Sequence, residues 1–207
     1  YQSPDYNGEP DDRAQALAII SGTLPQSHYS TIRDFFTQQY HASPYMEKYV
    51  LETLVKTGHG DYALERFKKR FATMIEDPFN TTLYEGWEIG AYGGGSTNHA
   101  WSGGMLTVIA ENICGVRPLT AGWKSFEVCP DPVISECEIV IPSVAGKIAS
   151  SFKDNEKKFV LTLTVPEGCK ANVKLPSTEY ASVSVNGKAN EGALEFSAGT
   201  YNISCRK

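Results

Sequence analysis

The chain has 207 residues, of which 41% are hydrophobic and 21% are charged, with 18 glycines and 11 prolines. This composition is that of an ordinary globular protein and excludes a disordered, collagen-like or low-complexity chain. The formal net charge of -5 argues against a nucleic-acid or anionic-membrane partner, because both favour basic surfaces. No apolar run approaches the roughly 20 residues of a transmembrane helix, so we expect no membrane-spanning segment.

Two parts of the chain differ in composition. Residues 1–116 contain 14 acidic and 8 basic residues, whereas residues 117–207 contain 10 and 11, and all four histidines lie in the first part. This asymmetry predicts two domains, 1–116 and 117–207. The first residues, 1–5, lack the basic and apolar stretches of a signal peptide and an initiator methionine, so we expect a piece of a longer protein.

The first part predicts a series of amphipathic helices. Asp11 and Asp12 can cap the first helix, Ser27 the second, Pro44 opens the third, and Gly60 begins the fourth. The links between these helices are short, which predicts successive antiparallel hairpins. A fifth helix is expected around residues 105–113, after a glycine-rich loop at 77–98. Loops of this length within a helical domain are usually functional or disordered.

The second part predicts short β-strands, because its apolar residues recur with period two. Alternate residues from Phe159 to Val165 are hydrophobic, as are those from Cys137 to Ile141. Asn186-Gly187 follows a short apolar strand and is a strong hairpin signal. Seven or eight such strands separated by turns indicate an antiparallel β-sandwich.

The chain has five cysteines and no C-x-x-C motif. Because five is an odd number, the cysteines cannot all be paired in disulfides. One or two bridges in the second part remain open, but we favour buried free thiols, since free cysteine buries readily. Histidines lie in the first part and four of the five cysteines in the second, so we expect no structural metal site and no cofactor.

Two segments contain polar and aromatic residues of the kinds that act in catalysis and ligand binding. Residues 80–88 read N-T-T-L-Y-E-G-W-E, and residues 96–103 read S-T-N-H-A-W-S-G. Aromatic faces beside carboxylates suit sugars, whose CH faces stack on rings while their hydroxyls bond to acidic and amide groups. The residues alone leave a second interpretation open, in which this is a packed loop with surface glutamates and His99 at a helix start.

The end of the catalytic domain of bacterial α-L-rhamnosidases resembles two segments of this chain, residues 81–88 and residues 98–103. The similarity continues in short segments on either side, so that it covers nearly the whole chain: 43–45, 60–64, 115–119, 122–123 and 146–148. The resemblance implies that residues 1–116 are the C-terminal part of an (α/α)6 helical-hairpin barrel and that residues 117–207 are a C-terminal antiparallel β-sandwich. It also implies hydrolysis of terminal α-L-rhamnosyl linkages with inversion of configuration.

The resemblance further implies roles for individual residues. Glu85 matches the general base of the family and His99 the histidine that contacts the sugar, with Asn98 as a supporting hydrogen-bonding group. Four other residues are candidates for the pocket wall, although barrel packing or loop support remains equally open for them: Trp87, Glu88, Tyr45 and Trp101.

An (α/α)6 barrel needs twelve helices, and the sequence predicts five. The general acid of the family lies on an earlier part of the barrel and has no counterpart here. We therefore expect the partners to be the upstream remainder of the barrel and a rhamnose-containing glycan or glycoside. Because general acid catalysis contributes roughly 10²–10⁴-fold, we also expect no useful turnover from this chain alone.

Two alternatives stay open. The chain could be a carbohydrate-binding β-sandwich module with supporting helices, which would require exposed rings among Trp123, Tyr180 and Tyr201. It could also derive from an (α/α)6 hydrolase for another sugar, because a helical pattern and one glutamate do not define a substrate.

Overall fold

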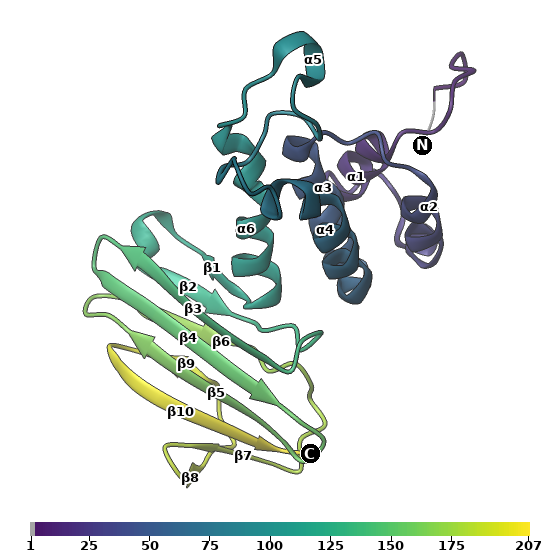
Figure 1. Cartoon of the computed structure of the whole chain (residues 1–207). Helices are drawn as coiled ribbons and strands as arrows, with labels where there is room; N and C mark the ends of the chain where they lie inside the picture. Colours follow the sequence, from purple (N-terminus) through teal and green to yellow (C-terminus); the bar gives the residue numbers. More distant parts are fainter. Residues whose placement is uncertain (1–2) are drawn as a thin grey trace. The chain divides into compact units, whose positions relative to one another are not determined.

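The computed structural model describes residues 3–207, which divide into two compact units, one ending at Val108 and the other spanning Ile109–Lys207 (Figure 1). The division precedes the boundary expected after residue 116. The reason is that the π-helical turn η3 (Ile109–Ile113) contacts strand β1 (Val116–Pro118) and therefore belongs with the sheets. Residues 1 and 2, part of the expected processed start, lie outside the described residues.

The helical unit begins with α1 (Asp12–Ile20), η1 (Gln26–Thr31), α2 (Ile32–Gln38), α3 (Pro44–Lys56) and α4 (Gly60–Ile75). Asp11 and Ser43 cap α1 and α3, because their side chains accept hydrogen bonds from first-turn N–H groups. Gly22 and Gly58 follow these helices with positive φ angles of 74° and 83°. The first, third and fourth expected helices are therefore confirmed.

Two expected helices differ from the structure. Ser27 does not cap α2 but lies within the 3₁₀ turn η1, and α2 begins only at Ile32. The fifth helix, expected around residues 105–113, consists of α6 (Met105–Val108) and η3, and the 3₁₀ turn η2 (Ala100–Gly104) precedes it. A Cβ at Gly104 would lie 3.2 Å from the Cβ of Lys48, so glycine allows η2 to approach α3 closely but disfavours a regular helix.

A buried ionic network joins three helices of this unit. Arg66 of α4 bonds to Glu47 of α3, with 2.7 Å between Nε and Oε1, and to Asp12 of α1, with 2.9 Å between Nη2 and Oδ2. These three side chains are fully buried. Arg70 bonds to the other oxygen of Glu47. Because buried charges are stable only when paired, the network fixes the relative positions of α1, α3 and α4.

The second unit consists of two sheets around one hydrophobic core. A four-stranded sheet has the order β1-β2-β6-β9 and a six-stranded sheet the order β3-β4-β5-β10-β7-β8. After β1 and the turn η4 (Ala121–Trp123), the strands are β2 (Ser125–Val128), β3 (Glu136–Ser143), β4 (Gly146–Asp154), β5 (Lys158–Val165), β6 (Lys170–Val173), β7 (Ser182–Val185), β8 (Lys188–Ala189), β9 (Glu195–Phe196) and β10 (Gly199–Arg206).

Several strand predictions are confirmed. Alternate residues of β5, from Phe159 to Val165, are buried, and β7 and β8 form the expected hairpin. Asn186 and Gly187 at its turn have φ angles of 49° and 77°, as a type I′ turn requires. One correction is that β2 and β6 pair in parallel, so the sandwich is not purely antiparallel.

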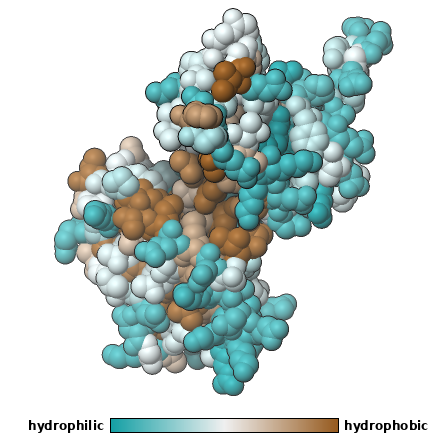
Figure 2. All heavy atoms as spheres, in the orientation of Figure 1, coloured by the Kyte–Doolittle hydropathy of each residue, from teal (hydrophilic) through white to brown (hydrophobic). Residues whose placement is uncertain are grey.

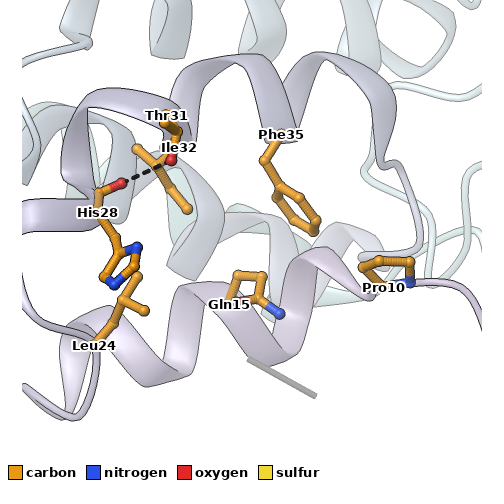
Figure 3. A pocket seen from close by; sticks show the side chains of 7 residues that line it. All are labelled: Pro10, Gln15, Leu24, His28, Thr31, Ile32 and Phe35. Carbon is orange, nitrogen blue, oxygen red and sulfur yellow. Dashed lines mark hydrogen bonds between the residues drawn. The ribbon is translucent and has the colours of Figure 1, made fainter. Parts of the chain in front are cut away.

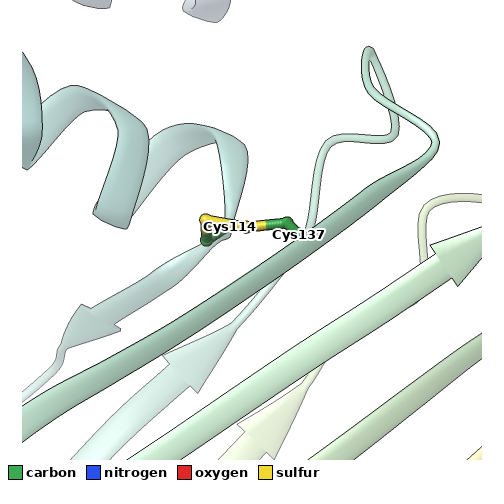
Figure 4. The surroundings of a disulfide bond; sticks show 2 residues. All are labelled: Cys114 and Cys137. Atoms are coloured by element: carbon green, nitrogen blue, oxygen red, sulfur yellow. A yellow bond between two sulfur atoms is a disulfide. The ribbon is translucent and has the colours of Figure 1, made fainter.

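A disulfide joins Cys114, two residues before the start of β1, to Cys137 on β3 (Figure 4). It links the four-stranded sheet to the six-stranded sheet. The preference for free thiols is therefore wrong for these two cysteines, because the fold brings residues 23 positions apart to a Cα–Cα distance of 6.2 Å. The other three cysteines are free: Cys129, Cys169 and Cys205.

Replacing Cys114 with serine is expected to lower the free energy of unfolding of the sheet unit by about 2–4 kcal/mol, because the open chain gains conformational entropy when unfolded. Urea denaturation of both proteins without reductant measures this difference. Dithiothreitol should destabilise the wild-type protein by a similar amount and leave the Cys114→Ser variant unchanged. Equal stability of the two proteins under oxidising conditions would contradict the cross-link.

Candidate active site

Two backbone segments of the helical unit pair side by side and bring the sequence motifs together. The Glu85 N–H donates to the Ser96 carbonyl at 2.9 Å, and the His99 N–H donates to the Leu83 carbonyl at 2.8 Å. The Thr82 hydroxyl also donates to the carbonyl of Thr97. Residues 82–85 and 96–99 are therefore held next to each other although the loop 86–95 separates them.

Glycines allow this loop to fold tightly around the single-turn helix α5 (Ala91–Gly94). A Cβ at Gly86 would lie 2.3 Å from the Cβ of Ala91. A Cβ at Gly95 would lie 2.7 Å from the Ala91 carbonyl oxygen and 3.3 Å from Glu85 Oε2. These close approaches exclude larger residues at both positions.

Glu85 and His99 face each other across the paired segments. Glu85 Oε2 accepts a hydrogen bond from the Ser96 N–H at 3.0 Å and lies 3.7 Å from His99 Nδ1. The Ser96 hydroxyl lies 3.4 Å from the same ring nitrogen. The two side chains are 28% and 29% exposed, so both are supported by the protein and accessible to a ligand.

An aromatic surface extends from His99. The ring centroids of His99 and Trp101 are 4.3 Å apart, and Trp101 stacks on Tyr45 of α3 with a centroid distance of 5.0 Å. Trp101 and Tyr45 are both exposed. Exposed rings beside a carboxylate are typical of surfaces that bind the CH face of a sugar.

The structure brings five of the seven predicted residues together. Glu85, His99, Trp101 and Tyr45 form the continuous group described above, and exposed Asn98 directly precedes His99. The Ser96 hydroxyl donates to the Asn98 carbonyl at 3.0 Å and accepts a hydrogen bond from the Asn98 N–H at 3.3 Å.

Trp87 and Glu88 occupy different surroundings. The Trp87 indole N–H donates to the Ala42 carbonyl at 2.8 Å, and its ring packs against Phe71. Glu88 lies on the exposed part of the loop, where its carbonyl accepts a bond from the Ala91 N–H. Within residues 3–207, neither side chain makes a hydrogen bond, ion pair or ring contact with Glu85 or His99.

Sequence reasoning missed Ser96, which contacts both Glu85 and His99. Its position two residues before Asn98, at the end of a glycine run, is the only sequence signal that could have indicated it. It also missed Asp77 and Ser102, which hold Tyr84, the residue directly before Glu85. The Tyr84 hydroxyl donates to Asp77, and the buried Ser102 hydroxyl donates to the Tyr84 carbonyl at 2.6 Å.

The Asp77 carboxylate accepts several hydrogen bonds at the start of the loop. Tyr84 and Asn80 donate to it through their side chains, the latter at 3.0 Å, and the Phe79 N–H donates at 2.7 Å. These hydrogen bonds to the charged form, that of Tyr84 above all, hold the pKa of Asp77 well below its ordinary value of 3.8. The same bond raises the pKa of Tyr84.

We expect Asp77→Asn to lower the free energy of unfolding of the helical unit at neutral pH. The free energy of unfolding of the variant should also fall less at acid pH than that of the wild-type protein. Because the native pKa is depressed, the wild-type carboxylate stabilises the fold above about pH 4 and loses this contribution as the pH falls further. The stability difference between the two proteins, measured by urea denaturation, should therefore stay constant from pH 7 to about pH 5 and shrink as the pH falls from about 4 to about 2. A difference that stayed constant over this range would show that the carboxylate charge does not matter.

Two hollows lie elsewhere on the helical unit. A groove of about 440 Å³ runs beside α4 and α6 and is lined mostly by apolar side chains, including those of Phe67, Met74 and Leu106. Figure 2 shows hydrophobic surface, in brown, over these helices. A smaller cleft of about 260 Å³ involves α1, η1 and α2, with His28 and Gln15 among its lining residues (Figure 3). Glu85 and His99 line neither hollow.

The aromatic rings of the sheet unit pack on its core. Tyr180 stacks on Phe159, and Trp123 meets Phe126 edge-on. Tyr201 packs against the core and donates its hydroxyl to the Ser197 carbonyl at 3.1 Å. These three rings are half-buried, so residues 117–207 have no exposed Trp or Tyr ring of the kind that a carbohydrate-binding sandwich module requires.

Within residues 3–207, no cluster of three or more His, Cys, Asp or Glu side chains is arranged to hold a metal ion. None of the helices in this range is both long and apolar enough to cross a bilayer.

Comparison with known proteins shows what this arrangement of a helical part followed by a β-sandwich resembles. Residues 115–190 match the family model of the bacterial alpha-L-rhamnosidase C-terminal domain. An alpha-L-rhamnosidase of Formosa agariphila is 27% identical over 68% of the chain, and one of Streptomyces avermitilis is 26% identical over 73%. The chain spans 16% of the length of each of these relatives.

Solved structures of alpha-L-rhamnosidases share the fold. The enzyme from Dictyoglumus thermophilum matches 96% of the chain with a TM-score of 0.81 and 20% identity, and the chain covers 26% of it. The Streptomyces avermitilis enzyme, solved in complex with L-rhamnose, matches 99% with a TM-score of 0.74 and 22% identity, and the chain covers 22% of it. The predicted resemblance is confirmed: the chain is similar to the C-terminal part of α-L-rhamnosidases.

Proposed function

We propose that this chain forms one side of the active site of an α-L-rhamnosidase, with a rhamnose-containing glycan or glycoside as substrate. The observation that carries the proposal is the close pair of Glu85 and His99 beside the exposed ring of Trp101. The complex of the Streptomyces avermitilis relative with L-rhamnose supports the choice of sugar. The remainder of the active site comes from the upstream part of a longer parent polypeptide.

Glu85 is the general base in this proposal. The Ser96 N–H holds Oε2 through a charge-assisted hydrogen bond at 3.0 Å, which leaves Oε1 to take a proton from water. The water attacks the anomeric carbon while a protonated acid on the opposite side of the sugar, about 6.5–9.5 Å from the base, protonates the departing oxygen. The configuration at the anomeric carbon is thereby inverted.

The neighbouring residues orient the sugar. His99 directs Nδ1 towards Ser96 and Glu85, so Nε2 is the nitrogen available to a sugar hydroxyl. Trp101 and Tyr45 offer ring faces to the CH groups of the sugar, and the Asn98 amide adds a hydrogen-bonding group. Glu88 would reach the substrate only from the exposed loop.

The helical unit is, in the same proposal, the C-terminal part of an (α/α)6 barrel. Support comes from the structural relatives, which match nearly the whole chain while the chain covers only 26% and 22% of two of them. The missing helices would supply the general acid and complete the sugar pocket.

An aryl α-L-rhamnoside assay on the parent polypeptide and on the 207-residue chain tests this proposal. We expect hydrolysis by the parent, with inverted rhamnose as the first product by NMR. The isolated chain should be at least about 100-fold slower, because it lacks the general acid. Preference of the parent for a different aryl glycoside would refute the choice of sugar, and comparable turnover by the isolated chain would refute the missing acid.

A further inference from the structure

The segment that carries Glu85 has an aromatic residue packed on the core of the helical unit on each side. Tyr84 precedes Glu85 and is only 2% exposed, and Trp87 follows two residues later and packs against the helical core. Gly86 between them is buried against Ala91. The position of the Glu85 carboxylate is therefore determined by how firmly these two aromatic residues are held.

Trp87 is held on several sides. Its N–H donates to the Ala42 carbonyl at 2.8 Å, and its ring meets Phe71 edge-on with a centroid distance of 5.0 Å. The Arg70 guanidinium lies 4.0 Å from the centre of the indole ring. A guanidinium over an indole face at this distance is a favourable cation–π contact.

Arg70 is itself held by hydrogen bonds to other residues. It bonds to the buried Glu47 carboxylate and donates to the Ala42 carbonyl at 3.0 Å, the same carbonyl that receives the Trp87 N–H. Glu47 is also bound by Arg66. The buried ionic network of α1, α3 and α4 thus continues through Arg70 and Trp87 to the loop that carries Glu85.

We infer that Trp87 and Arg70 form an anchor that positions Glu85, and that Trp87 is a positioning residue that makes no contact with the sugar. The inference rests on the proposed function only in giving Glu85 a chemical role. Trp87 uses one face, one edge and its N–H within the protein, and its ring packs against the core of the helical unit.

Backbone hydrogen exchange of the 207-residue chain tests the anchor directly, with Trp87→Phe as the main variant. Phenylalanine keeps an aromatic ring for Phe71 but removes the hydrogen bond to Ala42. Exchange at the paired amides of Glu85 and His99 should become about three- to tenfold faster, the effect of losing one hydrogen bond. Arg70→Lys keeps the charge near Glu47 but loses the planar face, and should act in the same direction.

Tyr62→Phe is the matched control. This substitution also removes an aromatic donor to a backbone carbonyl, that of Phe36 at 3.1 Å, and Tyr62 lies on α4 as Arg70 does. Among the described residues, Tyr62 makes no hydrogen bond or ring contact with residues 82–99. Its effect on exchange at Glu85 and His99 should be less than about twofold. Unchanged exchange in both Trp87→Phe and Arg70→Lys, or equal changes in the control, would overturn the anchor.

Kinetics of the parent polypeptide separate positioning from sugar contact. Trp87→Phe should lower kcat about tenfold or more while KM changes less than about twofold, because misplacing a catalytic group costs rate more than ground-state binding. A rise in KM with unchanged kcat would instead make Trp87 a sugar contact. If Glu85→Gln left activity intact while the exchange result held, the proposed function would fail and the anchor would stand.

Discussion

Glu85→Gln in the parent polypeptide is expected to lower kcat for an aryl α-L-rhamnoside by about 10²–10⁴-fold, the usual contribution of a general base. Glutamine retains the shape of the side chain and a carbonyl oxygen for the Ser96 N–H, but it has no basic oxygen for the attacking water. Binding should change little, so KM should stay within about threefold of the wild-type value. Steady-state kinetics at several substrate concentrations measure both parameters.

The matched control for this change is Glu65→Gln, the same substitution at an exposed position on α4. It should leave both kcat and KM unchanged. Retention of the wild-type kcat by Glu85→Gln would remove Glu85 from the role of base. A loss of kcat accompanied by an equal loss in the control would point to instability of the helical unit instead.

Glu47→Gln is expected to destabilise the helical unit by about 3–5 kcal/mol, the usual cost of removing one partner from a buried ion pair. The Glu47 carboxylate is fully buried and binds both Arg66 and Arg70. A neutral amide leaves two buried guanidinium groups with Asp12 as the remaining carboxylate of the network. Because a domain is stable by only about 5–15 kcal/mol, this is a large part of the total.

Urea denaturation of the 207-residue chain measures this loss, with Glu52→Gln on the same helix as the control. Glu52 pairs with Lys56 at 3.0 Å on the surface, and such pairs contribute no more than about 0.5 kcal/mol. A similar small effect for both substitutions would show that the buried network contributes little to stability.

The elements that the sequence predicts correctly have local signals. Asp11 and Ser43 cap α1 and α3 within one turn, and Asn186-Gly187 meets the conformational demand of its hairpin without help from distant residues. The alternation along β5 is equally local, since one face of the strand lies on the core.

The elements that differ depend on distant contacts. The fifth helix changes from α6 to η3 where the chain approaches β1, which η3 contacts, and no local pattern contains that contact. The disulfide joins Cys114 to Cys137, and the parallel pairing joins β2 to β6 of the same sheet although β3, β4 and β5 lie between them in the chain. Neither contact follows from a local pattern.

The candidate site divides in the same way. Glu85 and His99 could be identified because they stand in recognisable motifs, and the structure places them 3.7 Å apart. Ser96 and Arg70 could not, because their importance lies in contacts across the fold, with Glu85 in one case and Trp87 in the other. Trp87 was predicted as a pocket-wall candidate from its aromatic character alone, which does not distinguish sugar contact from packing.

The most direct test of the proposed site is a crystal structure of the parent polypeptide with L-rhamnose bound. We predict the sugar within hydrogen-bond distance, about 3 Å, of Glu85 and His99, with a CH face on the ring of Trp101. Rhamnose bound only on the sheet unit, or in a pocket that includes neither Glu85 nor His99, would contradict the proposed function.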